Sequence, residues 1–485
     1  MKSINLIFLI IILGSSANAQ APDTLWTRTY GGPFNDYGRS LDITYDGDYV
    51  IAGEIFSLET GSYDIYLIKI NPDGDTLWSK TYGGINSEYG NSVIQTSDGG
   101  FAVVGETRSF GAGSYDVYFL KTDASGDTLW ARTYGGDDYE KGHSIFQTSD
   151  GGYIITGLTR SSGNGEDDVF LIKTDSAGNI TWVRTYGGAY HDWGNSVLQT
   201  PDDGFIVAGV TDTIGSDLID VYVIRTDANG DTVWTRTIGG GGDDCVFSIQ
   251  ESPNSGYILA GFTSSFGAGI VDGYLININD SGDTIWTRTY GGEDYDNVKS
   301  ACQTPDGGYI LGGTTQSFGA IIRDLYIIKT DSLGNVIWSG IYGGPGADLA
   351  LSIKQTSDDG YIIAGATTSY GAGNHDVYIV KLSSDQTSVA DRELSLLPDN
   401  IVLHTNYPNP FNATTVFRFA LPEPRDVRLT IYDLLGRKIQ IMIDEYVQAG
   451  NHTVTFDASD LSSGIYFYRL QSGDMVETRR MVLLK

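Results

Sequence analysis

The sequence is poor in cysteine, proline and basic residues. Two cysteines in 485 residues exclude a disulfide-stabilised scaffold. Proline is scarce at 12 residues while glycine reaches 63, a balance that favours many tight turns over disorder. The 30 basic residues stand against 61 acidic ones, a net charge of −31. Such a surface repels nucleic acid and anionic membranes, and both are excluded as expected partners.

Sustained helical periodicity and long apolar runs are also lacking. The only strongly apolar stretch, INLIFLIIILG, follows Lys2 and precedes the small residues Ala17 and Ala19. This order predicts a cleavable secretory signal over residues 1–19. An uncleaved anchor is the alternative, but the run is short of the about 20 residues that a membrane span needs. We therefore expect no membrane span in the mature chain.

A repeat of 52 residues runs through most of the chain. Each unit contains four short stretches rich in Val, Ile, Tyr, Phe and Thr, separated by turns with Asp and Gly. Four antiparallel strands repeated every ~40–50 residues are typical of a β-propeller blade. The period is fixed by seven tryptophans: Trp26, Trp78, Trp130, Trp182, Trp234, Trp286 and Trp338.

The seventh unit ends at DVYIVKLSSD without a tryptophan strand, and the unmatched strand DTLWTRTYG lies near the N-terminus. We expect this strand to complete the seventh blade, which closes the ring and removes a free sheet edge. The sequence thus predicts an all-β chain with a seven-bladed β-propeller over residues 20–384. A solenoid of stacked hairpins is the alternative, but it would not need a strand from the other end.

The turn before each tryptophan resembles the tryptophan-docking motif of quinoprotein-type propellers. It reads DASGDTLW from Asp123 to Trp130, and Asn279 replaces the leading aspartate in the turn before Trp286. The resemblance implies that blade docks on blade through this turn. It does not extend to a quinone site, because the adjacent cysteine pair of those dehydrogenases is missing. Cys245 and Cys302 either pair with each other or stand unlinked.

After a polar linker over residues 385–402, residues 403–485 contain the segments NYPNPFN, YDLLGR and LSSGIY. Together these segments resemble the type A C-terminal sorting domain of the type IX secretion system of Bacteroidetes-like bacteria. The resemblance implies an immunoglobulin-like β-sandwich, recognition by the type IX machinery, removal by a sortase-like peptidase, and a secreted or outer-surface location. A plain accessory sandwich is the alternative. The matching positions include Pro408, Asn409, Pro410, Phe411, Gly436, Arg437, Gly464, Tyr466 and Lys485.

One carboxylate recurs in every repeat, on the link that leads into the first strand of a blade. Seven like charges near one mouth of a ring repel one another unless they are paired or bound to cations. Ca²⁺ is the candidate cofactor because it prefers hard oxygen ligands; the alternative is that each acid caps its own turn. The residues are Asp36, Glu88, Glu140, Asp192, Asp244, Asp296 and Asp348.

Residues that break the repeat are better candidates for ligand binding than those that keep it. The fourth link contains Tyr190, His191 and Trp193, and Trp193 is the only tryptophan outside the 52-residue series. The neighbouring third link contains Tyr139, and the sixth link contains Tyr295. Exposed aromatics beside acids suggest stacking on a sugar ring; the alternative is that they fill gaps between loops.

Catalytic motifs are missing: no HExxH, nucleophile elbow or P-loop occurs. A glycosidase needs only two carboxylates, and nothing in the sequence selects which two. Two functions remain. One is a non-enzymatic binding or adhesion module for a glycan or a surface protein. The other is a polysaccharide hydrolase or lyase.

Overall fold

The computed structural model describes residues 21–485 with internal gaps. The gaps are 213–217, 253–255, 319–321 and 386–400, and short stretches of the C-terminal part: 404, 405, 407–410, 412, 422, 423, 435, 448, 449, 460, 474, 484 and 485. The predicted signal segment therefore lies outside the described residues. No helix within the described part is long and apolar enough to cross a membrane.

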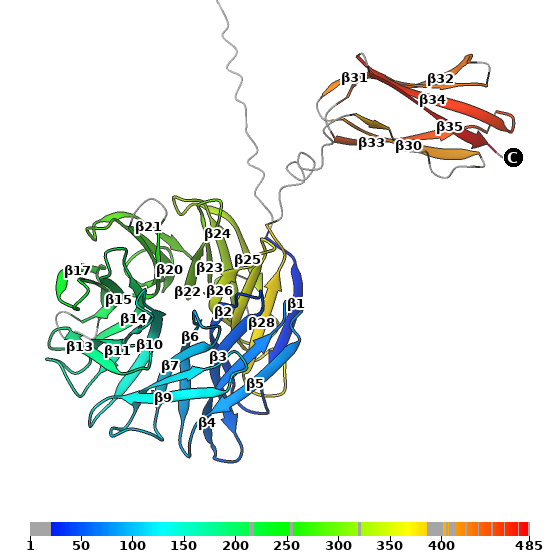
Figure 1. Cartoon of the computed structure of the whole chain (residues 1–485). Coiled ribbons are helices and arrows are strands. Elements are labelled where there is room, and N and C mark those ends of the chain that lie inside the picture. The colour runs from blue at the N-terminus through cyan, green and yellow to red at the C-terminus, as the bar shows by residue number, and fades with distance from the viewer. Residues whose placement is uncertain are drawn as a thin grey trace, which may run out of the picture. The chain divides into compact units, whose positions relative to one another are not determined.

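Seven four-stranded antiparallel sheets form a ring, the predicted seven-bladed propeller (Figure 1). The first strand of each blade contacts the first strand of the next, and β26 contacts β2, so these strands surround the axis. Blades 1 to 3 are β2 (Tyr37–Ile43), β3 (Tyr49–Ser57), β4 (Ser62–Ile70) and β5 (Thr76–Tyr82); β6 (Glu88–Gln95), β7 (Phe101–Thr107), β8 (Asp116–Thr122) and β9 (Thr128–Tyr134); and β10 (Glu140–Gln147), β11 (Tyr153–Thr159), β12 (Asp168–Thr174) and β13 (Ile180–Tyr186).

The other four blades follow the same order. They are β14 (Asp192–Gln199), β15 (Phe205–Thr211), β16 (Asp220–Thr226) and β17 (Thr232–Ile238); β18 (Asp244–Glu251), β19 (Tyr257–Thr263), β20 (Asp272–Ile278) and β21 (Thr284–Tyr290); β22 (Asp296–Gln303), β23 (Tyr309–Thr315), β24 (Asp324–Thr330) and β25 (Val336–Tyr342); and β26 (Asp348–Gln355), β27 (Tyr361–Thr367), β28 (Asp376–Leu382) and β1 (Thr24–Tyr30).

The seventh blade takes its outermost strand from the other end of the propeller sequence. β1 pairs antiparallel with β28, with Trp26 opposite Lys381 and Tyr30 opposite Val377. The ring is therefore closed by ladder hydrogen bonds, and the outer edge of β28 is covered.

Each blade docks on the next through the repeated tryptophan. The ring of Trp78 lies against Gly126 and leaves no room for a side chain there, because a Cβ would lie 2.9 Å from the indole. Gly126 also has a φ of 78°, which favours glycine. The Tyr82 hydroxyl donates to the Gly126 carbonyl at 2.5 Å. The same packing recurs at Trp26 and Gly74, Trp130 and Gly178, Trp182 and Gly230, Trp234 and Gly282, and Trp286 and Gly334.

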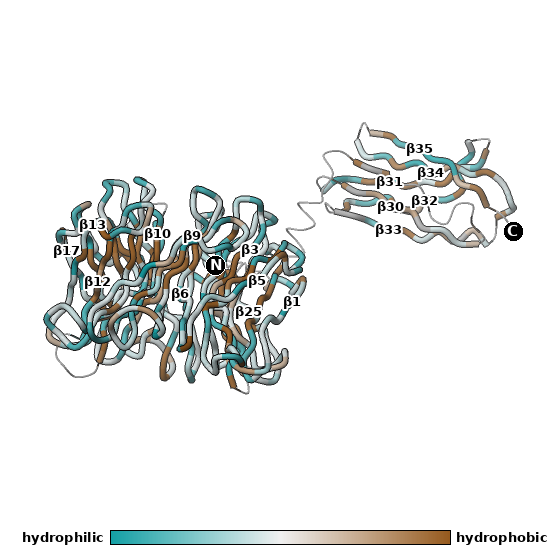
Figure 2. The backbone as a smooth tube through the Cα atoms, turned by 60° about the horizontal axis from the view of Figure 1, so that its bottom comes forward, coloured by the Kyte–Doolittle hydropathy of each residue, from teal (hydrophilic) through white to brown (hydrophobic). Residues whose placement is uncertain are grey.

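Apolar residues fill the middle strands, while the turns at both ends of the blades are hydrophilic (Figure 2). In β7 and β8 every residue is buried. The first strands differ because each contains a bulge, as between Gly38 and Ser40 in β2. The repeated serine after the bulge ties neighbouring first strands together: Ser40 Oγ accepts from the Val93 amide at 3.1 Å. The bulged residue itself faces the axis.

The C-terminal unit consists of two sheets, in agreement with the predicted β-sandwich. The sheets are β29 (Val402–Leu403), β30 (Thr414–Leu421) and β33 (Gly450–Asp457); and β32 (Lys438–Val447), β31 (Arg425–Tyr432), β34 (Gly464–Ser472) and β35 (Met475–Leu483). Phe417, Phe419, Leu429, Tyr468 and Leu470 are buried between the two sheets.

Several sorting-motif residues have clear structural roles in this unit. Phe411 is 2% exposed and bridges to β35. Gly436, at φ 76°, completes a turn in which Arg437 pairs with Asp433 at 2.7 Å. The Tyr466 hydroxyl donates to the Ser462 carbonyl, and Gly464 begins β34. Pro408, Asn409, Pro410 and Lys485 lie outside the described residues.

Candidate functional site

The seven repeated carboxylates all lie where the sequence places them, on the link into each first strand, and all are at most 3% exposed. Each accepts a hydrogen bond from the amide of the glycine four residues earlier, as Glu88 does from Gly84 at 2.7 Å. The second oxygen of Glu88 accepts from the Thr107 hydroxyl and the Ser109 amide. Glu140 repeats this pattern with Thr159 and Ser161.

These contacts support the role of each acid as a turn cap, while the Oδ1 atoms of Asp244 and Asp296 are buried without a hydrogen-bond partner among the described residues. Burial raises the pKa values of Asp36 and Asp192, and backbone amides offset part of that rise. Among the described residues no group of three or more His, Cys, Asp or Glu side chains is arranged to hold a metal ion. The Ca²⁺ site therefore stays a prediction, for which the turn-cap alternative has a specific partner at every position.

The symmetry-breaking residues His191 and Trp193 meet at a buried carboxylate, Asp167. His191 Nδ1 lies 2.6 Å from Asp167 Oδ2, and Trp193 Nε1 donates to the same oxygen at 3.2 Å. Arg160 donates to Asp167 Oδ1 at 2.5 Å. Burial alone would raise the pKa of Asp167, but these three hydrogen bonds hold it below its usual value. The outer ring nitrogen of His191 lies 3.1 Å from Glu166.

Tyr139 joins the same cluster through Arg160, whose guanidinium lies 5.5 Å from the centre of the tyrosine ring. On its other side Tyr139 contacts Tyr115, with ring centres 5.3 Å apart in an edge-on arrangement. Lys141 lies 5.2 Å from the Tyr139 ring and pairs with Glu106 at 3.3 Å. Aromatic faces, cations and carboxylates thus alternate along this part of the mouth.

From Tyr115 a row of aromatic rings continues across blades 2 and 1. The ring centres are 6.4 Å apart for Tyr89 and Tyr115, 5.6 Å for Tyr63 and Tyr89, 5.3 Å for Phe56 and Tyr63, and 4.7 Å for Phe34 and Phe56. All of these rings retain exposed surface. We call this set the aromatic arc: Phe34, Phe56, Tyr63, Tyr89, Tyr115, Tyr139, His191 and Trp193.

The arc covers blades 1 to 4, and a separate stacked pair, Tyr37 and His375 with ring centres 5.1 Å apart, joins blades 1 and 7. The positions on blades 5 to 7 that correspond to Tyr89 and Trp193 hold Cys245, Asn297 and Leu349. Tyr295, on the sixth link, lies apart from the arc beneath the guanidinium of Arg323 at 5.0 Å. Tyr190 adjoins His191 in the chain and is 39% exposed. Of the five predicted aromatic-site residues, the structure therefore joins Tyr139, His191 and Trp193.

The bulged residues of the first strands form a second asymmetric set, one level below the arc. Arg39 makes two 2.6 Å bonds to Glu54, and its guanidinium lies 5.7 Å from the Tyr37 ring. His143 bonds to the Gly194 carbonyl. Lys299 lies 3.3 Å from the centre of the Phe247 ring and, among the described residues, forms no ion pair. The full set is Arg39, Asn91, His143, Asn195, Phe247, Lys299 and Leu351.

Charges of different blades meet at the axis. Burial lowers the pKa of His143 to about 4, and the charges of Lys141 and Arg39 add to that effect. Burial lowers the pKa of Lys299 to about 8, and Arg39 again contributes. Arg39 on blade 1 therefore acts on residues of blades 3 and 6. The seven bulged residues include Arg39 and Lys299 and no acidic residue, although the whole chain is strongly acidic.

Comparison with known proteins identifies the C-terminal unit. Residues 405–484 match the family model described as "Secretion system C-terminal sorting domain". Residues 405–484 are a secretion-system sorting domain. The resemblance stated from the sequence is thereby confirmed, and the type IX secretion system exports this protein to the cell surface or beyond.

The following proteins are distantly similar to a large part of the chain. A curated protein, "Regulatory protein FlaEY" of Caulobacter vibrioides, is 24% identical over 257 residues, 47% of this chain and 26% of that protein. PorZ, a type IX surface component of Porphyromonas gingivalis, is 12% identical with a TM-score of 0.45, over 94% of this chain and 60% of PorZ. The propeller domain of the trilobed protease of Pyrococcus furiosus is 11% identical with a TM-score of 0.37, over 76% and 98%.

The chain thus spans about a quarter of the curated relative and three fifths of PorZ. The all-β propeller followed by a sandwich rests on the sheet topology of the chain itself.

Proposed function

We propose that the exported propeller is a non-enzymatic binding module and that the aromatic arc binds a glycan chain. The observation that carries the proposal is the row of partly exposed aromatic rings, each in contact with the next, that runs from Phe34 to Tyr139 on one part of a ring of otherwise equivalent blades. Packing needs recur in every blade, whereas a ligand contacts one part of the ring. An aromatic face offers apolar area to the C–H face of a sugar ring, and neighbouring charged groups orient its hydroxyls.

The charged residues of the arc suit this role. Arg160 and Lys141 lie beside the Tyr139 ring and offer N–H groups, and the buried carboxylates of Asp167 and Glu106 hold these two side chains in place. Asp167 is 2% exposed, so its bonds hold Arg160, His191 and Trp193 in place. A prearranged set of rings and polar groups loses little conformational entropy on binding. A surface protein as ligand would contact the same rings through apolar side chains.

The polysaccharide hydrolase or lyase remains the second reading of the same surface. A retaining glycosidase needs two carboxyl groups about 5–5.5 Å apart, one of them able to donate a proton. The repeated acids at this mouth are engaged by backbone amides and hydroxyls, which favours binding over turnover.

We further propose that a sortase-like peptidase removes residues 405–484 during export, since the sorting domain fixes the route of export and leaves the propeller to act outside the cell.

A glycan array probed with the full exported chain tests the proposal. Trp193→Ala and Tyr89→Ala should each lower binding about tenfold or more, because a buried aromatic contact is worth ~1–3 kcal/mol. Tyr295→Ala is the matched control, since it removes a tyrosine from the same face outside the arc. Equal losses from all three variants would contradict the role of the arc. Shortening of the bound glycans on incubation would favour the hydrolase or lyase.

A further inference from the structure

Glutamine side chains join neighbouring blades at the opposite ends of the first strands, away from the aromatic arc. The carbonyl oxygen of Gln147 accepts from the Ser97 amide of the preceding blade at 2.8 Å. Gln199 accepts from the Ser149 amide at 2.8 Å, and Gln95 accepts from the Tyr45 amide at 2.6 Å. One backbone N–H therefore satisfies one glutamine oxygen at each of these junctions.

Proline takes the place of this serine in blades 4, 5 and 6, as Pro201, Pro253 and Pro305, and the junction of blades 6 and 7 shows the consequence. The position that corresponds to Ser97 and Ser149 is Pro305, and proline has no N–H to donate. The carbonyl oxygen of Gln355 is buried and has no hydrogen-bond partner among the residues that the structure describes. A buried acceptor without a donor is unfavourable, and the missing donor here is one N–H group of known position.

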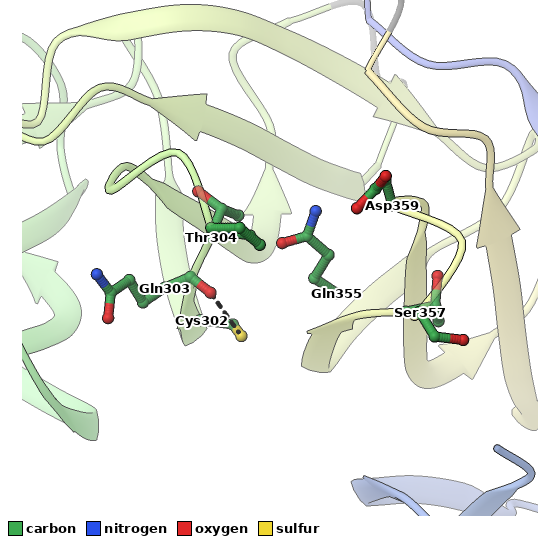
Figure 3. A pocket seen from close by; sticks show the side chains of 8 residues that line it. Cys302, Gln303, Thr304, Gln355, Ser357 and Asp359 are labelled. Carbon is green, nitrogen blue, oxygen red and sulfur yellow. Dashed lines mark hydrogen bonds between the residues drawn. The ribbon is translucent and has the colours of Figure 1, made fainter.

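A cavity of about 550 Å³ lies at this junction. Figure 3 shows Gln355 projecting between Thr304 of blade 6 and Asp359 of blade 7. Asp359 has a φ of 60° at a turn position where blades 2 and 3 use Gly99 and Gly151. Asp203 of blade 4 has a φ of 62° at the same turn position, so the cavity combines two substitutions that each occur elsewhere in the repeat. The lining residues are Cys302, Gln303, Thr304, Pro305, Gln355, Thr356, Ser357 and Asp359.

The charges around the cavity have one sign. The lining contains the carboxylate of Asp359, which forms no ion pair with any described residue, and contains no Lys, Arg or His. An adjoining hollow of about 350 Å³ adds Asp306 and Asp385. Lys329 neutralises Asp306 at 2.7 Å, and Asp385 accepts from Trp338 and Tyr361. The cavity thus offers acceptors and negative charge, and its lining contains no aromatic face for a sugar.

We propose that this cavity binds a protonated lysine side chain of a partner polypeptide. The ammonium group has three N–H donors: the carboxylate of Asp359 accepts from one, and the oxygen of Gln355, which has almost no accessible surface in the free protein, accepts from another once its side chain turns toward the cavity. A hydrogen bond in which both groups are charged is roughly twice as strong as a neutral one. The net charge of −31 draws a basic partner toward the surface before contact. The site lies at the opposite mouth and is independent of the proposed glycan site.

Cys302 provides a reporter for occupancy of the cavity. It is a free thiol that lines the cavity, while Cys245, the only other cysteine, is buried, and burial raises its pKa to about 12. Alkylation of the full chain therefore follows Cys302. The probe is the blocked peptide Gly-Gly-Lys-Gly-Gly, and its counterpart with Nε-acetyl-lysine is the neutral control. At about ten times its Kd the lysine peptide should slow alkylation about tenfold, because only the free site reacts.

Two variants connect the protection to the missing N–H group. Pro305→Ser restores the donor that blades 2 and 3 contain, and Gln355→Ala removes the acceptor; each should abolish protection. Pro201→Ser, the matching change at the junction of blades 4 and 5, should retain it. Equal protection by the acetylated peptide, retained protection in Pro305→Ser, protection by glucosamine but not by the peptide, or no protection up to roughly 20 mM peptide would each overturn the proposal.

Discussion

Substitution of Gly126 by alanine tests how blades are held together. Gly126 has a φ of 78°, and a Cβ on it would lie 2.9 Å from the Trp78 ring and 3.2 Å from the Lys80 side chain. Gly99 is the matched control: its φ is 84°, and nothing lies within 4 Å of its Cβ position. Both substitutions place alanine in the left-handed region, at a cost of about 1–2 kcal/mol.

Only Gly126→Ala also displaces the docked indole. Forcing a methyl group into a packed contact costs a further ~1–3 kcal/mol, so Gly126→Ala should reduce the free energy of unfolding by about 2–5 kcal/mol in all. Gly99→Ala should reduce the free energy of unfolding only by the cost of placing alanine in the left-handed region, about 1–2 kcal/mol. Urea unfolding of the full chain, followed by tryptophan fluorescence, measures both. Equal losses in the two variants would refute the claim that the tryptophan–glycine contact docks the blades.

Three further predictions concern the axis, the acidic positions and the closure of the ring. His143→Asn, which introduces the residue found at 91 and 195, should lose about 2–3 kcal/mol less stability than the wild type between pH 6.5 and 4. The folded-state pKa of His143, about 4, lies below the unfolded value, so its protonation favours the unfolded chain; equal pH slopes of the two proteins in urea unfolding would contradict this. Glu88→Gln should lower the free energy of unfolding by about 1–3 kcal/mol equally in Ca²⁺ and in EDTA, because its partners are backbone amides and a hydroxyl. A loss seen only in Ca²⁺ would support the cation site instead. Deletion of residues 21–31 removes β1 and exposes β28, so limited proteolysis should cut blade 7 first; unchanged resistance would show that the pairing contributes little.

The architecture could be predicted because the 52-residue period repeats every local preference seven times. The strand of Trp26 precedes the first unit, and the seventh unit lacks a tryptophan strand. The sequence therefore indicates that these two ends of the repeat pair with each other. The sorting domain was equally accessible from sequence, since Phe411, Gly436 and Arg437 belong to fixed segments that need no knowledge of tertiary contacts.

The candidate site was only partly predictable. Trp193 and His191 stood out because they interrupt the repeat within one link. Tyr63, Tyr89 and Tyr115 come from different strands and become neighbours only when adjacent blades dock. A comparison of every repeat position, beyond the links alone, would have shown that these positions change from blade to blade.

The axial residues needed the structure for a different reason. Arg39 and Lys299 occupy bulges, and alternation along a strand does not show which residue will bulge toward the axis. The missing hydrogen-bond donor of Gln355 could not be predicted for a related reason, because Pro305 is an ordinary turn residue in the sequence. Its missing N–H matters only because the glutamine of the next blade lies beside it.

The most direct test of the aromatic arc is affinity measured against ligand length. Isothermal titration of the full chain with an oligosaccharide series, built from the sugar that the array selects, reports whether the rings act as one continuous surface. Affinity should rise with each added sugar until the arc is covered, and Trp193→Ala should shorten the length at which it levels off. Affinity that does not depend on length, or a series unaffected by Tyr89→Ala and Trp193→Ala, would contradict the account.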